Sequence, residues 1–299
     1  MEGFKTVQDA INSIPSNNNR WTKIHLQSGT YVEQVTIPHD KPCIFLEGEG
    51  RKSTIITYND HSQTDKSATF SSYPPNVIGK GITFQVISRL IALYRAGVVP
   101  ALAARVYGDK SAFYDCGFVG VQDTLWDAAG RHYFSNCYVE GAVDFIFGRG
   151  QSFYEVHVLH SCTCTLHFCL TFHELIASHG RENANDPSGF VFSGGRVEDG
   201  APGVHTLLGR AYRKYSRVIF QSTYLSAAID PRGWDAWHYA GQEQNFVYVE
   251  ADCRGPGADK SKRVPWEKNL DPRDPSLLRQ FSKEVFVDQD GWIANQPTS

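Results

Sequence analysis

Two aspartates recur in similar surroundings near the middle of this 299-residue chain. Residues 116–123 read CGFVGVQD and residues 137–144 read CYVEGAVD, so cysteine, glycine and aspartate each return after 21 residues. Two neighbouring carboxylates tend to split their pKa values, which leaves an ionised nucleophile or base beside a protonated general acid. Asp144 also stands in an apolar run, between Val143 and the sequence FIF. An aspartate in such a run is usually paired or functional, so we interpret this pair as a candidate catalytic dyad rather than as two solvated turn residues.

The segments around this pair predict many short strands. A short amphipathic helix ends at Pro15, and apolar or β-branched runs closed by turn residues follow, among them KIHLQSG, CIFLEGEG and HYFSNCYVEG. Such runs are typical of a sandwich, a barrel or a solenoid. No Asn-Gly hairpin turn separates them, and the 21-residue return suits one coil of a parallel β-helix. Residues one coil apart would then stack about 4.8 Å from each other, with Cys116 over Cys137 and Asp123 over or beside Asp144. Residues 152–158, SFYEVHV, would begin a third coil.

Composition sets the broad class of the protein. Hydrophobic residues make up 41% of the chain and charged residues 20%, with a net charge of −3, as in ordinary soluble globular proteins. No basic stripe argues for nucleic acid, and no apolar run has the length of a membrane span. The first residues do not read as a targeting sequence. Seven cysteines are an odd number, and we expect Cys116 and Cys137 to be small buried side chains rather than a disulfide framework.

Longer segments of the chain resemble a known family. GVQDTL, GAVDFIFG and LLGRAYRKYSRVIFQSTYLSAAIDPRGW are similar to signature segments of plant-type pectin methylesterases, or pectinesterases, which are carbohydrate esterases. FKTVQDAINSIP, GTYVEQVTIP, ARVYGDKSAFYDCGF and RVPW extend the resemblance from Gly3 to about Trp292. It implies an all-β, right-handed parallel β-helix with a shallow cleft, in one domain of residues 1–299. A short N-terminal helix and a C-terminal helical or loop extension would flank it.

The resemblance also implies a reaction and the residues that carry it. The reaction is hydrolysis of galacturonate methyl esters in pectin, which releases methanol and leaves free carboxylates on the polymer. By position, Asp144 matches the nucleophile, Asp123 the general acid/base, Arg210 the arginine that keeps the nucleophile ionised, and Gln122 an oxyanion donor. These residue types suit the roles, because a guanidinium fits a carboxylate fork and an amide can hydrogen-bond a developing negative charge. No metal and no organic cofactor is implied.

Six further positions match substrate-contacting residues of the family, five of them aromatic side chains that would stack on sugar rings. They are Thr64, Trp126, Phe147, Tyr212, Trp234 and Trp237. For Phe147, packing between coils is an equally good interpretation. Trp234 and Trp237 follow the turn sequence DPRG, so we expect an exposed binding face there.

Pro100 departs from the family pattern. The family has a second glutamine 22 residues before that of QDTL, in a run resembling QAVALRV, and Pro100 in PALAARV occupies this position. Proline has no side-chain donor and no backbone N–H, so one oxyanion contact is expected to be missing and the esterase weakened. The preceding residues of the atypical segment 86–100, VISRLIALYRAGVV, also differ from the polar loop expected there.

A second departure lies in residues 157–176, where histidines and cysteines crowd together. They are His157, His160, Cys162, Cys164, His167, Cys169 and His173. Both residue types are zinc ligands, but Cys-x-Cys followed by His-x-Cys is not a standard structural zinc spacing. Alternate residues of a strand also face opposite ways. We therefore favour an altered, space-filling coil over a metal site.

Alternative functions follow from these departures. The leading hypothesis is an active pectinesterase, and the alternative is a catalytically impaired β-helix that binds pectin or a protein partner. A lyase-like β-helix would need a calcium site rich in aspartate, and the sequence shows no such cluster. The resemblance further implies a monomer in the extracellular cell wall and a proteinaceous pectinesterase inhibitor as partner, although this chain begins at the domain without a signal peptide. No nucleic-acid or membrane partner is expected.

Overall fold

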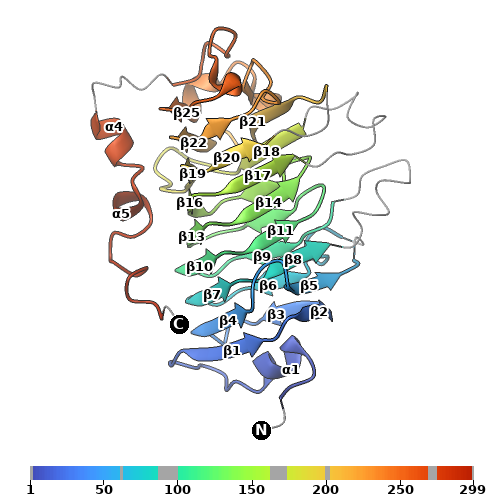
Figure 1. The fold of residues 1–299 in the computed structure, drawn as a ribbon. Coiled ribbons are helices and arrows are strands. Elements are labelled where there is room, and N and C mark those ends of the chain that lie inside the picture. The colour runs from blue at the N-terminus through green and yellow to red at the C-terminus, as the bar shows by residue number, and fades with distance from the viewer. Residues whose placement is uncertain are drawn as a thin grey trace.

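The computed structural model describes residues 3–60, 63–86, 100–161, 174–198, 203–268 and 275–297. Within these residues the strands form three parallel sheets, and the chain passes from one sheet to the next in successive coils (Figure 1). Sheet A has nine strands, and sheets B and C have eight strands each. Each inner strand pairs in parallel with the strand one coil before it and the strand one coil after it. The predicted parallel β-helix is therefore confirmed.

Sheet A contains β1 (Thr22–Leu26), β4 (Ile44–Gly48), β7 (Val77–Lys80), β10 (Ser111–Tyr114), β13 (Arg131–Ser135), β16 (Gln151–Glu155), β19 (Gly189–Ser193), β22 (Arg217–Gln221) and β25 (Val247–Ala251). Sheet B contains β2 (Gly29–Val32), β5 (Thr54–Tyr58), β8 (Thr83–Val86), β11 (Gly117–Val119), β14 (Tyr138–Gly141), β17 (Val158–Ser161), β20 (Arg196–Glu198) and β23 (Tyr224–Leu225). Sheet C contains β3 (Val35–Ile37), β6 (Phe70–Ser72), β9 (Ala104–Val106), β12 (Leu125–Asp127), β15 (Ile146–Gly148), β18 (Glu174–His179), β21 (Thr206–Ala211) and β24 (Trp234–Asp235).

Helices flank this β-helix, as the sequence predicts. The N-terminal helix α1 (Val7–Asn12) is capped by Thr6, whose hydroxyl accepts a hydrogen bond from the backbone N–H of Asp9 at 3.0 Å. Towards the C-terminus the helices are η1 (Trp237–Tyr239), η2 (Glu243–Asn245), η3 (Pro256–Ala258), α4 (Pro275–Arg279) and α5 (Lys283–Phe286). The segment with α4 and α5 runs back along the side of sheet A (Figure 1), where Phe281, Phe286 and Trp292 join a cluster with strand residues such as Val191 and Ile219.

A column of stacked aromatic rings fixes the register of the coils. Phe113, Phe134, Tyr154, Phe192 and Phe220 occupy equivalent positions on successive strands of sheet A. Their ring centroids lie 5.2, 4.5, 4.7 and 4.5 Å apart, and all five side chains are buried. Because one residue of slippage would turn every ring to the other face of its strand, this column strongly favours a single register.

The 21-residue return of the sequence corresponds to this register. Gly117 pairs with Tyr138 and Gln122 with Val143, so the two similar segments lie on adjacent coils. Cys116 and Cys137 are both buried and not disulfide-bonded, as predicted. The third coil is confirmed too, since β16 pairs with β13.

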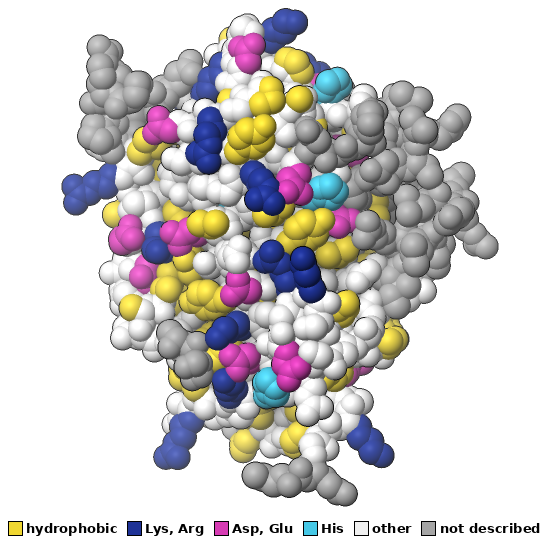
Figure 2. Space-filling view, in the orientation of Figure 1, with side chains coloured by type: hydrophobic (Ala, Val, Ile, Leu, Met, Phe, Trp, Pro, Cys, Tyr) yellow, Lys and Arg dark blue, Asp and Glu magenta, His cyan; other side chains and the backbone are white. Residues whose placement is uncertain are grey.

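The surface of the described chain carries charges of both signs. On the face shown in Figure 2, basic and acidic side chains are interspersed. Pairs such as Lys23 with Glu47 and Arg196 with Glu198 contribute to this mixture. Among the described residues, no helix is long and apolar enough to cross a membrane.

Candidate active site

Asp123 and Asp144 lie in equivalent loops that lead from sheet B into sheet C. Asp123 stands between β11 and β12, and Asp144 stands between β14 and β15 on the next coil. The backbone N–H of Asp123 donates to the carbonyl oxygen of Val143 at 3.0 Å, which ties the loops together. The φ angles of the two aspartates are 60° and 45°, a left-handed conformation that aspartate tolerates better than most residues.

The recurring glycine before each aspartate makes the loop possible. A Cβ atom on Gly141 would lie 2.1 Å from the Cβ atom of Phe145, and one on Gly120 would lie 2.7 Å from the Oγ1 atom of Thr124. No other residue type fits such close approaches. Glycine and aspartate therefore return together because one tight loop is built twice.

Arg210 reaches Asp144 from β21, two strands further along sheet C. Its Nη2 atom donates to Oδ2 of Asp144, and the side chains are 18% and 11% exposed. The other carboxylate oxygen, Oδ1, is buried and has no hydrogen-bond partner among the described residues. The predicted pairing of Arg210 with Asp144 is therefore confirmed.

The pKa values of both carboxyl groups are raised, and their surroundings differ. Burial and then the charge of Asp144 raise the pKa of Asp123 to about 7, while Arg210 partly opposes this. Burial raises the pKa of Asp144 as well, and the directly bonded Arg210 guanidinium lowers it. Because Arg210 stabilises the charged form of Asp144 by direct contact, we assign the ionised state to Asp144 and the retained proton to Asp123.

Trp237 holds the guanidinium of Arg210 from the other side. Its ring centroid lies 3.9 Å from the Cζ atom of Arg210, within the range of a cation–π interaction. Trp237 has a φ angle of 47°, and its backbone N–H donates to Oδ1 of Asp235 at 2.8 Å. Tyr212 stacks on Trp237 with centroids 6.3 Å apart. The structure thus brings Tyr212 and Trp237 beside the Asp144–Arg210 pair, together with Asp235, which sequence reasoning missed.

One row of side chains runs across sheet C and includes Arg210, the partner of Asp144. The strand register places the following residues side by side on β9, β12, β15, β18, β21 and β24: Arg105, Trp126, Phe147, Ser178, Arg210 and Asp235. The rings of Trp126 and Phe147 stack with centroids 5.5 Å apart, and both side chains are partly exposed. We call these residues the cleft row, and it includes two of the predicted sugar-binding aromatics.

Trp234 does not lie on this face, so the expectation of an exposed Trp234 is wrong. It pairs with Gly209 and is only 2% exposed, and its ring stacks on Tyr248 with centroids 4.6 Å apart. Neighbouring residues of a strand face opposite ways, so Asp235 takes the outward position beside Arg210 and Trp234 points into the core.

Gln122 and Pro100 lie on adjacent coils, at the loop that carries Asp123. Gln122 is partly buried and directly precedes Asp123. Its carbonyl oxygen accepts a hydrogen bond from the backbone N–H of Ala101 at 3.2 Å, which places Pro100 one residue from this contact. Residues 87–99 of the atypical segment lie outside the described residues.

Thr64 lies in a turn beside Arg105, at one end of the cleft row. The next residue, Asp65, accepts a hydrogen bond through its carbonyl oxygen from Nη1 of Arg105 at 3.1 Å. The carbonyl oxygen of Thr64 accepts one from the Ser67 hydroxyl, also at 3.1 Å. Thr64 therefore belongs to the end of the cleft row that begins with Arg105.

Two of the candidate metal ligands fall within the described residues. His157 is buried with Nδ1 3.3 Å from the carbonyl oxygen of Tyr154, and burial lowers its pKa to about 4. His160 lies 3.4 Å from the Glu198 carboxylate. The described part of the chain holds no group of three or more potential metal ligands. Cys162, Cys164, His167, Cys169 and His173 lie outside it.

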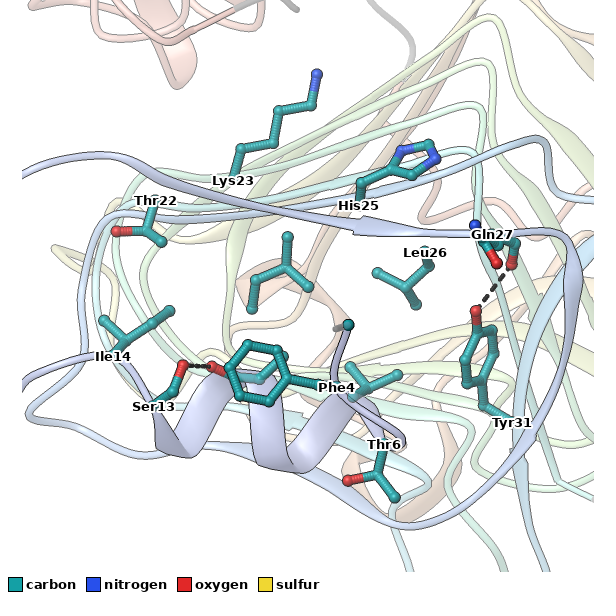
Figure 3. Close-up of a pocket in the computed structure, with 14 residues that line it drawn as sticks. Phe4, Thr6, Ser13, Ile14, Thr22, Lys23, His25, Leu26, Gln27 and Tyr31 are labelled. Carbon is teal, nitrogen blue, oxygen red and sulfur yellow. Dashed lines mark hydrogen bonds between the residues drawn. The ribbon is translucent and has the colours of Figure 1, made fainter. Parts of the chain in front are cut away.

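A separate pocket opens at the N-terminal end of the β-helix (Figure 3). It has a cavity volume of about 500 Å³ and lies between α1 and the first strands, with Phe4, Leu26 and Tyr31 among its lining residues. Its side chains do not bring two carboxylates together.

Known proteins share the sequence pattern and the fold of this chain. The sequence model described as Pectinesterase matches residues 1–290. A relative from Arabidopsis thaliana, "Putative pectinesterase 10", is 44% identical over 98% of this chain and 84% of its own length. The chain belongs to the pectinesterase family. Among solved structures, "Pectin methylesterase from Carrot" shares 29% identity with a TM-score of 0.90, over 99% of this chain and 94% of that one. The pectin methylesterase from Aspergillus niger shares 27% identity with a TM-score of 0.81, over 98% and 93%.

These comparisons bear out the resemblance and the fold drawn from the sequence. The right-handed parallel β-helix is confirmed, and so is a carboxylic ester hydrolase acting on pectin methyl esters. They favour this activity over the catalytically impaired binder.

Proposed function

We propose that the chain hydrolyses the methyl esters of galacturonate units in pectin through a covalent intermediate on Asp144, within one catalytic domain of residues 1–299. The observation that carries this proposal is the Asp144–Arg210 pair with Asp123 on the adjacent coil. In the first half-reaction, the carboxylate of Asp144 attacks the ester carbonyl carbon. The bond to the methoxy oxygen then breaks as Asp123 gives its proton to departing methanol. A mixed anhydride between Asp144 and the sugar carboxyl carbon remains.

Water completes the second half-reaction. Asp123, now ionised, takes a proton from water as the oxygen attacks the sugar carbonyl carbon of the anhydride. The anhydride bond breaks, Asp144 returns to its carboxylate form beside Arg210, and a free galacturonic acid group leaves. Asp123 is protonated again, so the cycle closes with one ester and one water converted to methanol and one acid group. Trp126, Phe147, Tyr212, Trp237 and the turn at Thr64 would hold the neighbouring sugar units.

The oxyanion contact is where this chain should differ from an ordinary family member. Gln122 would donate to the developing negative charge, whereas Pro100 offers no donor. Gln122→Ala should lower kcat about 10²- to 10³-fold with little change in KM, because the contact forms only in the transition state. Replacing residues 86–100 by a family-like loop that ends in glutamine should raise kcat, and methanol release from methylated pectin measures both effects.

Two outcomes would change this account of the oxyanion contact. If the parent already turns over as fast as the loop-replaced protein, the second glutamine is dispensable. If both proteins bind pectin and neither releases methanol, the catalytically impaired binder becomes the better interpretation.

The raised pKa of Asp123 predicts the pH dependence of the reaction. Asp123 must be protonated to release methanol, so kcat/KM should fall about tenfold per pH unit above about 7. At low pH the rate should fall as Asp144 takes up a proton. Initial rates between pH 4 and 9, corrected for spontaneous ester hydrolysis, measure this profile. An alkaline limb that persists in Asp123→Asn would show that another group causes it.

The setting of the reaction follows from the substrate. We propose that the protein acts outside the cell in the cell wall, where pectin is found, as a monomer that a proteinaceous pectinesterase inhibitor can block. Plant relatives named as pectinesterases support this proposal. Size-exclusion chromatography of the purified chain tests the monomer, and fractionation of expressing tissue tests the localisation.

A further inference from the structure

We propose that Arg105 forms a second anion-binding point in the cleft, which binds the free carboxylate of a galacturonate unit other than the one being hydrolysed. This inference rests on the proposed function for the identity of the polymer. Binding at Arg105 would make the protein prefer partly de-esterified substrate, a preference that the catalytic residues alone do not produce.

The register of sheet C places Arg105 in the cleft row. It pairs with Trp126 on the next strand, and Trp126 pairs with Phe147, which lies three residues after Asp144. Two strand spacings separate the backbone of Arg105 from that of Phe147, a distance of about 10 Å. Arg105 therefore faces the same side of sheet C as Arg210, the partner of Asp144, and four strand spacings, about 19 Å, separate the backbones of the two arginines.

Aromatic rings hold the guanidinium of Arg105 in place. Its Cζ atom lies 4.2 Å from the ring centroid of Trp126, 5.3 Å from that of Tyr73 and 5.8 Å from that of Tyr107. Nη1 also donates to the Tyr73 hydroxyl at 3.3 Å. Tyr107 is 43% exposed, so this cluster borders on solvent. A guanidinium held by rings loses little further freedom when an anion binds, which favours affinity.

Arg105 has no carboxylate partner among the described residues, unlike comparable arginines. Arg263 forms two hydrogen bonds with Glu250, and Arg131 does the same with Asp109. In the cleft itself, Arg210 is committed to Asp144. The Nε atom of Arg105 is buried and has no hydrogen-bond partner in the described part of the chain. Among the described residues, no carboxylate therefore balances the positive charge of Arg105.

The chemistry of pectin supplies that counter-ion. A methyl-esterified unit presents a neutral group, whereas each hydrolysed unit presents a carboxylate, which a guanidinium can bind through charge-assisted hydrogen bonds. Arg105 would therefore discriminate between the two kinds of unit. The enzyme would bind best where one unit still carries its ester at Asp144 and a more distant unit has already lost its own.

Binding of the fully de-esterified oligogalacturonate tests this inference without any turnover. Calorimetric titration with the oligomer measures the dissociation constants of the parent and of Arg105→Gln. The dissociation constant of Arg105→Gln should be about tenfold or more higher than that of the parent. Arg105→Lys should recover part of the affinity, because a lysine keeps the charge and loses the fork. Arg196→Gln is the matched control. Arg196 is 56% exposed on β20 of sheet B and pairs with Glu198, so its replacement should leave the affinity unchanged.

Each other outcome has a definite meaning. Equal affinities of the parent and Arg105→Gln overturn the proposal, as does a parent that does not bind the oligomer. A lowered melting temperature with unchanged affinity shows that Arg105 only stabilises the fold, which also overturns it. If Arg105→Gln fails to fold, Arg105→Met keeps an apolar stem on Trp126 and is judged by the same criterion. Because the oligomer is the reaction product, the result stands even if the role of Asp144 proves different.

Discussion

Asp144→Asn should abolish turnover, with kcat reduced on the order of 10⁴-fold or more, because an amide cannot attack the ester and form the anhydride. The asparagine side chain has nearly the same shape, so it can occupy the same loop and accept a hydrogen bond from Arg210. Methanol release from methylated pectin measures the loss. Circular dichroism and the melting temperature establish that the protein is folded.

Asp115→Asn is a matched control for this change. Asp115 also lies in a turn with a left-handed φ angle, of 53°, but it is exposed and accepts a hydrogen bond from the Asn136 side chain. Its replacement should leave kcat within about twofold of the parent, as for most exposed positions. If Asp144→Asn turned over as fast as Asp115→Asn, Asp144 could not be the nucleophile.

Asp123→Asn should lower kcat about 10²- to 10⁴-fold, the usual contribution of a general acid or base. Both half-reactions need this residue, first to protonate methanol and then to activate water. Some slow acylation should remain, because Asp144 and Arg210 are unchanged. Steady-state methanol release measures the rate, and a rate within a few-fold of the parent would remove Asp123 from the mechanism.

The same variant should be more stable than the parent at alkaline pH. The pKa of Asp123 is about 7 in the folded chain and about 3.8 when unfolded, so the folded state binds this proton more tightly. Stability of the parent is therefore lost as pH rises from about 4 to above 7, and an asparagine does not pay this cost. The melting temperature of Asp123→Asn should exceed that of the parent at pH 8, with a smaller difference at pH 5.

The sequence predicts the repeat-based part of the site well. A cysteine, a glycine and an aspartate that return together require one tight loop to be built twice, and stacking of the coils then brings the two aspartates to adjacent loops. The Asp144–Arg210 pair spans 66 residues, and no spacing in the sequence indicates it. It could be expected only from the resemblance to a family.

The residues that the sequence analysis misplaced or missed, Trp234 and Arg105, have physical explanations as well. Trp234 follows a turn, a place where an exposed aromatic side chain is expected. Which residue of β24 faces outward depends on the strand register, and it is Asp235, not Trp234, that pairs with Arg210. Arg105 stands among small apolar residues in AARV, an unusual place for a charge in a strand. The sequence therefore marks Arg105 as unusual. Its role could not be inferred from sequence, because it depends on contacts with Tyr73 and Trp126 from neighbouring coils.

The covalent intermediate on Asp144 is the central claim, and trapping it is the most direct test. Asp123→Asn should accumulate the mixed anhydride, because the base that activates water is absent. Hydroxylamine added during turnover of a methylated oligogalacturonate should convert part of this anhydride to a hydroxamate on Asp144, located by peptide mass spectrometry. The label should require substrate and be absent from Asp144→Asn. Methanol release with no label at residue 144, in either the parent or Asp123→Asn, would contradict the covalent mechanism.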